Sequence, residues 1–175
     1  MTSVCHDFLH TAQYYFIFYN KSLFRVNYMN PFACAKITGN NTYPELSGIA
    51  NFYEDAISGV WVEVELTGLP DMNSPINSNF YGMHIHTVGN CNIPFDQTGA
   101  HYNPNNLAHP NHAGDLPLLL GNNGYAYSLI YTNRFTPSEV LNKSIIIHSA
   151  PDDFHTQPSG NSGEKIGCGV IQKCG

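Results

Sequence analysis

Side chains that commonly bind metal ions are concentrated in one part of this 175-residue chain. The stretch from Gly82 to Leu116 contains five of the nine histidines, with an aspartate close behind the last of them. Imidazole nitrogens and carboxylate oxygens are ligands that metal ions often take from proteins. The stretch therefore predicts a metal centre. Its candidate ligands are His84, His86, His101, His109, His112 and Asp115.

His84 and His86 lie in a segment that alternates like a β-strand. Side chains two residues apart on a strand point to the same face, so both histidines can converge on one ion. His148 returns in a later apolar segment and can complete an all-imidazole set, which suits copper. No thiolate or thioether joins this set, and this disfavours an electron-transfer site of the blue-copper kind.

A second set follows in a loop crowded with Gly, Pro and Asn. It offers three imidazole nitrogens and one carboxylate, a closed tetrahedral set of the type that zinc prefers at structural sites. Its members are His101, His109, His112 and Asp115. The remaining histidines, His6, His10 and His155, stand apart from these sets, and we expect them to be structural or exposed to solvent.

Short runs of Val, Ile, Tyr and Phe, broken by Gly, Pro and Asn, indicate an all-β protein. The clearest alternation runs from Val60 to Leu66, so this strand should bury one face and expose the other. About eight antiparallel strands in a Greek-key barrel or sandwich are expected. They are Phe32–Thr38, Leu46–Tyr53, Val60–Leu66, Phe80–Val88, Leu116–Leu120, Tyr125–Thr132, Ser144–Ser149 and Gly167–Lys173.

Two connections are longer than ordinary loops, Gly89–Gly114 and Ala150–Ile166. Loops of this length without secondary structure are usually functional or disordered. The first holds His101, His109 and His112 and the second follows His148, so we expect both to close over one site. Residues 1–31 lack strand punctuation, and we expect a loosely ordered extension before a domain of residues 32–175.

The overall composition excludes some partners. A formal charge of −6 disfavours nucleic acid, whose phosphates need basic stripes on the protein. No apolar run approaches the roughly 20 residues of a membrane span. The N-terminal residues lack the basic start and cleavage site of a signal peptide. We therefore expect a cytoplasmic protein, with secretion as the alternative.

Five motifs, taken in order, resemble the copper/zinc superoxide dismutase family over the stretch from Phe32 to Cys174. They are GMHIH (Gly82–His86), GAHYNP (Gly99–Pro104), HPNHAGD (His109–Asp115), IIIHSAPDD (Ile145–Asp153) and GNSGEKIGCGVI (Gly160–Ile171). The resemblance implies superoxide as the substrate and a homodimer as the assembly. It also implies an enzyme in which copper cycles between Cu(II) and Cu(I) beside a structural zinc.

The resemblance also implies individual roles. His84, His86 and His148 resemble the copper ligands, and His101 resembles the histidine that bridges copper to zinc. A bridging imidazole must be deprotonated, because each ion takes one ring nitrogen. The remaining zinc ligands then correspond to His109, His112 and Asp115. Asp152 resembles the carboxylate that links a copper histidine, here His84, to a zinc histidine, here His109.

Two further positions follow from the same resemblance. Cys91 and Cys168 resemble the family's disulfide within one chain, which leaves Cys34 as a core residue and Cys5 and Cys174 as free thiols. The family's active-site arginine is replaced by Lys165, which keeps the positive charge and loses the guanidinium fork. We expect Lys165 still to guide the anionic substrate.

Two other classes of function are alternatives. The first is a copper- and zinc-binding protein on the same fold without turnover, because a fold alone does not fix a function. The second is a β-sandwich interaction module, which has no need of the histidines. The retained copper ligands favour the enzyme.

Overall fold

The computed structural model describes residues 30–56, 58–70 and 78–174. The expected N-terminal extension, with Cys5, His6 and His10, lies outside these residues except for its last two positions. The chain from Pro31 onward forms one compact unit. No helix in the described ranges is long and apolar enough to cross a bilayer.

The described residues form strands and two short 3₁₀ helices. The first strands are β1 (Ala33–Gly39), β2 (Ser47–Glu54), β3 (Val60–Thr67), β4 (Phe80–Tyr81) and β5 (Met83–His86). They are followed by β6 (Leu119–Leu120), β7 (Ala126–Thr132), β8 (Ser144–His148), β9 (Lys165–Val170) and β10 (Gln172–Lys173). The 3₁₀ helices are η1 (Asp96–Thr98) and η2 (Pro137–Val140).

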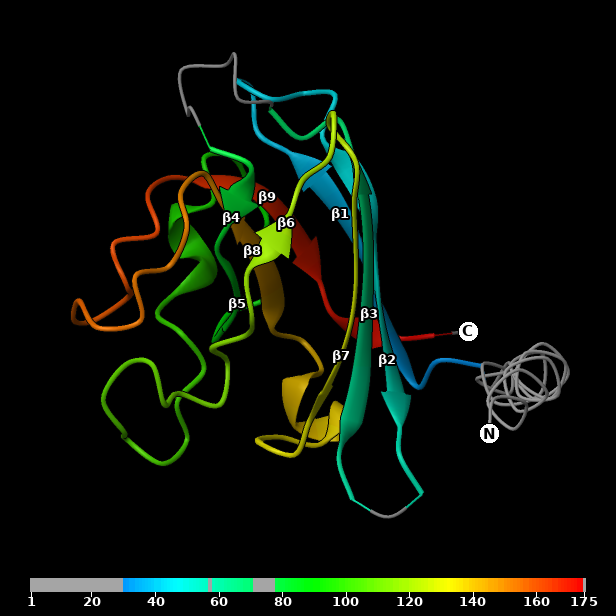
Figure 1. Ribbon diagram of the computed structural model, residues 1–175. Helices are drawn as coiled ribbons and strands as arrows, with labels where there is room; N and C mark the ends of the chain where they lie inside the picture. The colour runs from blue at the N-terminus through cyan, green and yellow to red at the C-terminus, as the bar shows by residue number, and fades with distance from the viewer. Residues whose placement is uncertain (1–29, 57, 71–77, 175) are drawn as a thin grey trace, which may run out of the picture. The chain divides into compact units, whose positions relative to one another are not determined.

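One curled antiparallel sheet makes up most of the molecule (Figure 1). Its strand order is β5-β8-β9-β1-β2-β3-β7, with β10 also paired to β1, while β4 and β6 form a separate small ladder. Because β3 pairs with β7 and not with the strand that follows it, the connection crosses over as in a Greek key. The predicted all-β fold with about eight antiparallel strands is confirmed.

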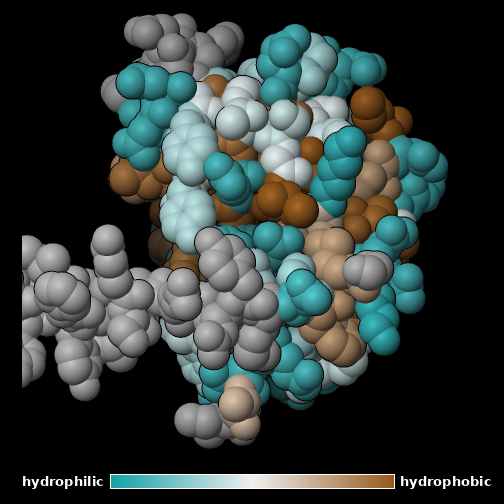
Figure 2. Space-filling view, turned by 90° about the vertical axis from the view of Figure 1, so that its right-hand side faces the viewer, coloured by the Kyte–Doolittle hydropathy of each residue, from teal (hydrophilic) through white to brown (hydrophobic). Residues whose placement is uncertain are grey.

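The core follows the predicted alternation. Val60, Val62, Val64 and Leu66 of β3 are fully buried, while Trp61 between them stays exposed. A strand presents successive side chains to opposite faces, so the alternating sequence of β3 directs one face into the core and the other toward solvent. Viewed from the side on which the C-terminal end lies, the surface mixes hydrophilic and hydrophobic side chains (Figure 2).

Several details of the strand prediction are wrong. Only Leu119–Leu120 of the expected strand Leu116–Leu120 forms a strand, and the expected Gly167–Lys173 divides into β9 and β10. The expected strand Phe80–Val88 divides at Gly82, because β4 pairs with β6 whereas β5 pairs with β8. Gly82 donates its amide to the Ala150 carbonyl at 2.9 Å and accepts the His148 amide at 2.8 Å. The expected last strand begins at Lys165 instead of Gly167.

The cysteines divide into a bonded pair and free thiols. Cys91 and Cys168 form the predicted disulfide, with their Cα atoms 5.6 Å apart. The core position expected for Cys34 is wrong: Cys34 is half-buried, between the inward-facing Ala33 and Ala35. Alternation along β1 therefore places the Cys34 thiol on the outward face of the sheet.

Candidate metal centre

The candidate metal ligands gather along the edge of β5 that does not pair with another named strand. β5 is the terminal strand of the main sheet, and β8 pairs with its other side. Both long loops lie on the side of the sheet formed by β4, β5 and β8 (Figure 1). Edge strands carry unpaired backbone groups that need partners. The loop after β5 supplies these partners and so brings its own side chains to the edge.

Backbone hydrogen bonds fix this loop along β5. The Ile85 amide donates to the Gly114 carbonyl at 2.9 Å, and the Tyr102 amide donates to the Ile85 carbonyl at 2.7 Å. The chain comes so close here that a Cβ atom on Gly114 would lie 2.4 Å from the Ile85 oxygen, which explains why glycine is needed. The pairing places His101 opposite His86, and Asp115 opposite His84.

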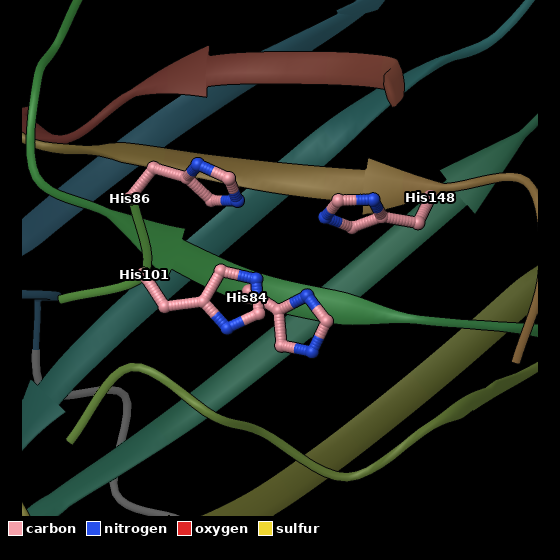
Figure 3. Close-up of side chains that lie close together, drawn as sticks. All are labelled: His84, His86, His101 and His148. Carbon is pink, nitrogen blue, oxygen red and sulfur yellow. The ribbon is translucent and has the colours of Figure 1, made fainter. Parts of the chain in front are cut away.

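Four histidine rings gather at this edge, and we call them the four-histidine group. They are His84 and His86 from β5, His148 from the end of β8, and His101 from the loop (Figure 3). One ring nitrogen from each lies within 4.8 Å of the others. All four residues are buried. The rings of His84 and His101 stack, with their centroids 3.9 Å apart.

A second set shares one ring with the first, and we call it the histidine–aspartate group. It consists of His101, His109, His112 and Asp115, whose ligand atoms also lie within 4.8 Å of one another. Asp115 Oδ1 is 2.7 Å from Nδ1 of His101, and its Oδ2 is 3.1 Å and 3.3 Å from Nδ1 of His109 and His112. One carboxylate therefore faces three imidazoles.

The unpaired nitrogens identify which atoms face the two groups. Six buried ring nitrogens have no hydrogen-bond partner within the described part of the chain, and all six belong to these histidines. They are Nδ1 of His84, His109 and His112, and Nε2 of His86, His101 and His148. Buried polar atoms are rarely left unpaired without a reason, such as an ion that they bind. The residues thus fit two cations that share the His101 ring.

The opposite nitrogens of these rings are mostly held by hydrogen bonds. His86 Nδ1 donates to the Gly99 carbonyl at 2.8 Å, and His148 Nδ1 lies 3.4 Å from the Gly163 carbonyl. A ring that donates on one side leaves its other nitrogen as a lone pair for an ion. These contacts therefore set the tautomer and the direction of the free nitrogen.

Burial keeps the rings of His84, His86 and His148 neutral. It lowers the pKa of His84 to about 2, with a further lowering from the charge of His101. Burial likewise lowers the pKa of His86 and of His148 to about 3. For Asp115, burial raises the pKa, but the hydrogen bond and charge of His101 outweigh it, so the net shift is downward. Neutral imidazoles and an ionised carboxylate are the forms that bind metal ions.

Asp152 contacts a histidine of each group. Its Oδ2 accepts from His84 Nε2 at 2.7 Å, and its Oδ1 accepts from His109 Nε2 at 2.9 Å. The carboxylate is buried, and the loop bends tightly around it at Gly160, which has φ +66°. A Cβ atom on Gly160 would lie 2.0 Å from Asp152 Oδ1, so only glycine fits there.

Lys165 lies near the four-histidine group. Its Nζ donates to Thr98 Oγ1 at 2.9 Å and to the Phe95 carbonyl at 3.3 Å. Its charge contributes to the lowered pKa of both His86 and His148, which places a positive charge near those rings. Burial lowers the pKa of Lys165 itself, against an opposing effect of Asp96.

The sequence reasoning missed two side chains that hold the loops. Gln157 clamps the backbone of His109, because its Nε2 donates to the His109 carbonyl at 2.7 Å and its Oε1 accepts the His109 amide at 3.0 Å. Arg134 Nη1 donates to the carbonyls of Pro110, His112 and Asp115 at 3.2–3.3 Å. No local signal marks either residue. His155 lies outside both groups and is exposed, as expected.

Comparisons with known proteins agree with this geometry. A family model described as copper/zinc superoxide dismutase (SODC) matches residues 46–171. A Cu-Zn superoxide dismutase of Deinococcus radiodurans is 35% identical over 150 residues, which cover 73% of this chain and 78% of that protein. Cu-Zn superoxide dismutase 2 of Aquifex aeolicus is 32% identical over 148 residues, covering 75% and 82%. An extracellular Cu-Zn superoxide dismutase of Rattus norvegicus is 25% identical over 138 residues, covering 73% and 55%.

Proposed function

The chain belongs to the copper/zinc superoxide dismutase family, and we propose that the two groups described above hold its metal ions. As a family member it converts superoxide to dioxygen and hydrogen peroxide, with copper and zinc as cofactors. Copper supplies the chemistry by alternating between Cu(II) and Cu(I), which zinc cannot do. We therefore propose which residues bind each ion and which role each residue has.

We assign copper to the four-histidine group and zinc to the histidine–aspartate group. Four imidazoles without a carboxylate suit copper, and three imidazoles with a carboxylate suit a closed zinc site. The observation that supports this most directly is the set of six unpaired nitrogens, divided between two groups that share His101. His101 is the residue on which the proposal depends.

His101 has a proton-carrying role in this proposal. Its Nδ1 is fixed at 2.7 Å from Asp115, while its Nε2 faces the four-histidine group. When Nε2 is not engaged as a ligand it can hold a proton, and the fixed ring keeps that proton where the reduced substrate lies. The proton on Nε2 then passes to the reduced substrate, water gives the second proton, and hydrogen peroxide leaves.

Lys165 has a guiding role in this proposal. The substrate is an anion and the chain has a formal charge of −6, so attraction must be local. The Lys165 ammonium is held by Thr98 and Phe95 next to His86. A fixed cation at this place draws superoxide toward the four-histidine group.

Metal analysis combined with superoxide turnover tests the assignment. We expect the purified chain to contain copper and zinc and to turn over superoxide. His101→Ala should abolish turnover, whereas His155→Ala, at an exposed histidine outside both groups, should keep metal content and turnover. Copper and zinc without turnover would favour the non-catalytic alternative, and equal loss in both variants would contradict the role of His101.

The assembly, the domain boundary and the compartment are further proposals. We propose a homodimer, supported by family membership and by exposed aromatic side chains on β3 and β7, namely Trp61, Tyr127 and Tyr131. Sedimentation of the purified protein tests the homodimer.

Residues 32–175 should keep full turnover without residues 1–31. We keep the cytoplasm as the proposed compartment and secretion as the alternative, and cell fractionation separates them.

A further inference from the structure

Two free thiols lie where β1 pairs with β10, one on β1 and one directly after β10. Cys34 belongs to β1, and Cys174 follows β10 directly. The register of these strands pairs Ala33 with Lys173 and Cys34 with Gln172. The same register places Cys174 opposite Phe32, and the Cys174 amide donates to the Phe32 carbonyl at 3.3 Å.

This register puts both thiols on one face. Cys174 lies two residues beyond Gln172, the direct partner of Cys34, so Cys34 and Cys174 are diagonal neighbours across the antiparallel pair. Diagonal neighbours on one face are close enough for their side chains to interact. Both cysteines are half-buried, in contrast to the fully buried Cys168.

The two thiols also interact electrostatically. Burial, together with the hydrogen bond and charge of the Cys34 thiol, raises the pKa of Cys174 to about 12. Cys174 therefore keeps its proton at neutral pH. Since thiol oxidation proceeds through the thiolate, the first oxidation should fall on Cys34, with Cys174 as the resolving partner.

We propose that Cys34 and Cys174 are a peroxide-sensitive pair that forms a second, reversible disulfide within the chain. The oxidant is hydrogen peroxide, the product of the enzyme. Its local supply rests on the proposed function, whereas the pairing of the two thiols rests on the β1–β10 register.

The chemistry balances in two steps. The Cys34 thiolate attacks one oxygen of hydrogen peroxide, the O–O bond breaks, and a sulfenic acid forms while hydroxide leaves and takes up a proton. The Cys174 sulfur then attacks the Cys34 sulfur, the S–O bond breaks, and the leaving hydroxide takes the Cys174 proton as water. Two thiols and one hydrogen peroxide thus give one disulfide and two waters.

The bond would join the two ends of the described domain. β1 is the first strand and sits between β9 and β2 in the main sheet, while β10 is the last strand. Chain ends are where local opening begins unless they are tied down. Hydrogen peroxide would therefore link the residue after β10 to β1 when turnover is fastest.

Peptide mapping of the metal-loaded, full-length protein tests the pair. A Cys5→Ser background removes the cysteine that lies outside the described residues. After treatment with equimolar hydrogen peroxide and alkylation, we expect a cross-linked peptide containing Cys34 and Cys174, in a monomeric chain about 2 Da lighter. Dithiothreitol should restore both alkylation sites. The matched Cys34→Ser variant should leave Cys174 alkylated after the same treatment.

Separate arms distinguish this proposal from the enzymatic one. In one arm peroxide is added, and in the other only a superoxide source is supplied, with and without catalase. Because superoxide also gives peroxide without an enzyme, the superoxide arm compares the native chain with His101→Ala. A disulfide with added peroxide, but no faster formation from superoxide in the native chain than in His101→Ala, would support the pair and count against turnover by this chain. Recovery of both cysteines as thiols or as sulfinic acids, or a cross-link between chains, would overturn the pair.

Discussion

Replacement of Asp152 by asparagine should weaken both metal sites at once. In the native loop each carboxylate oxygen accepts one ring N–H, from His84 and from His109. Asparagine keeps the shape but offers one acceptor oxygen and an NH₂ group, which can only donate. One histidine therefore loses its partner, or turns to the tautomer that protonates its metal-facing Nδ1.

The size of the effect follows from burial. Asp152 is 3% exposed and His84 is fully buried, so water cannot replace the lost contact. A hydrogen bond to a charged group contributes about 1.5–3 kcal/mol. Because about 1.4 kcal/mol corresponds to a factor of ten, the loss predicts a weakening of metal affinity by roughly 10- to 100-fold.

Competition with chelators measures the effect on each ion separately. Copper and zinc affinities of Asp152→Asn are compared with those of Asp153→Asn, which removes the same charge one residue away, where the carboxylate contacts Thr156 and His155. Asp152→Ala, which removes both acceptors, should weaken both ions further. If Asp152→Ala changes one affinity and leaves the other at the native value, or if Asp153→Asn has the same effect, the bridging role is refuted.

Four other predictions follow from the structure. Lys165→Glu should slow turnover by tenfold or more at unchanged metal content, and the native rate should fall as salt rises; a rate that rises with salt, together with an unaffected variant, refutes steering. Arg134→Met removes three hydrogen bonds to the loop of the histidine–aspartate group and should lower zinc affinity by roughly tenfold, as measured by chelator competition. The metal-free protein should lose stability as pH falls from 7 toward 3. Burial depresses the pKa of His84, His86 and His148 in the folded state, so the unfolded chain takes up protons at these residues first. The free energy of unfolding, measured with urea at pH 7 and at pH 5, should differ by about 2 kcal/mol for each histidine. Cys91→Ser opens a disulfide that spans 77 residues and should lower the free energy of unfolding by about 4–5 kcal/mol, measured with Cys168 also replaced to avoid a new thiol.

The fold class was readable from the sequence because strand burial is a local property. The alternation of Val60, Val62 and Val64 with Trp61 settles which face of β3 is buried without any knowledge of its neighbours. The division of the expected strand at Gly82 was not readable, because it depends on two different pairing partners far along the chain. The outward direction of Cys34 was readable, by contrast, because Cys34 alternates in phase with Lys36 and Thr38 along β1.

The candidate ligands could be chosen from the sequence because histidine is scarce and chemically specific. The residues that support them could not. Gln157 and Arg134 act through backbone carbonyls and amides, and such contacts place no demand on neighbouring sequence. Asp152 was found only through its place in a resembling motif. Its contacts with His84 and His109 span 68 and 43 residues.

These contacts explain how loops with little regular structure can hold a rigid centre. The first loop is fixed by pairing with the edge of β5 at Ile85, and the second is attached to His109 of the first through Asp152 and Gln157. Each loop therefore depends on the other for its conformation. A metal ion bound at either group should order both, because a ligand that binds only the folded arrangement stabilises everything on which that arrangement depends. The His109 amide donates a hydrogen bond to Gln157 Oε1. Its hydrogen exchange should therefore slow when copper alone is added to the metal-free protein. Exchange at His109 that responds to zinc and not to copper would show that the loops are independent.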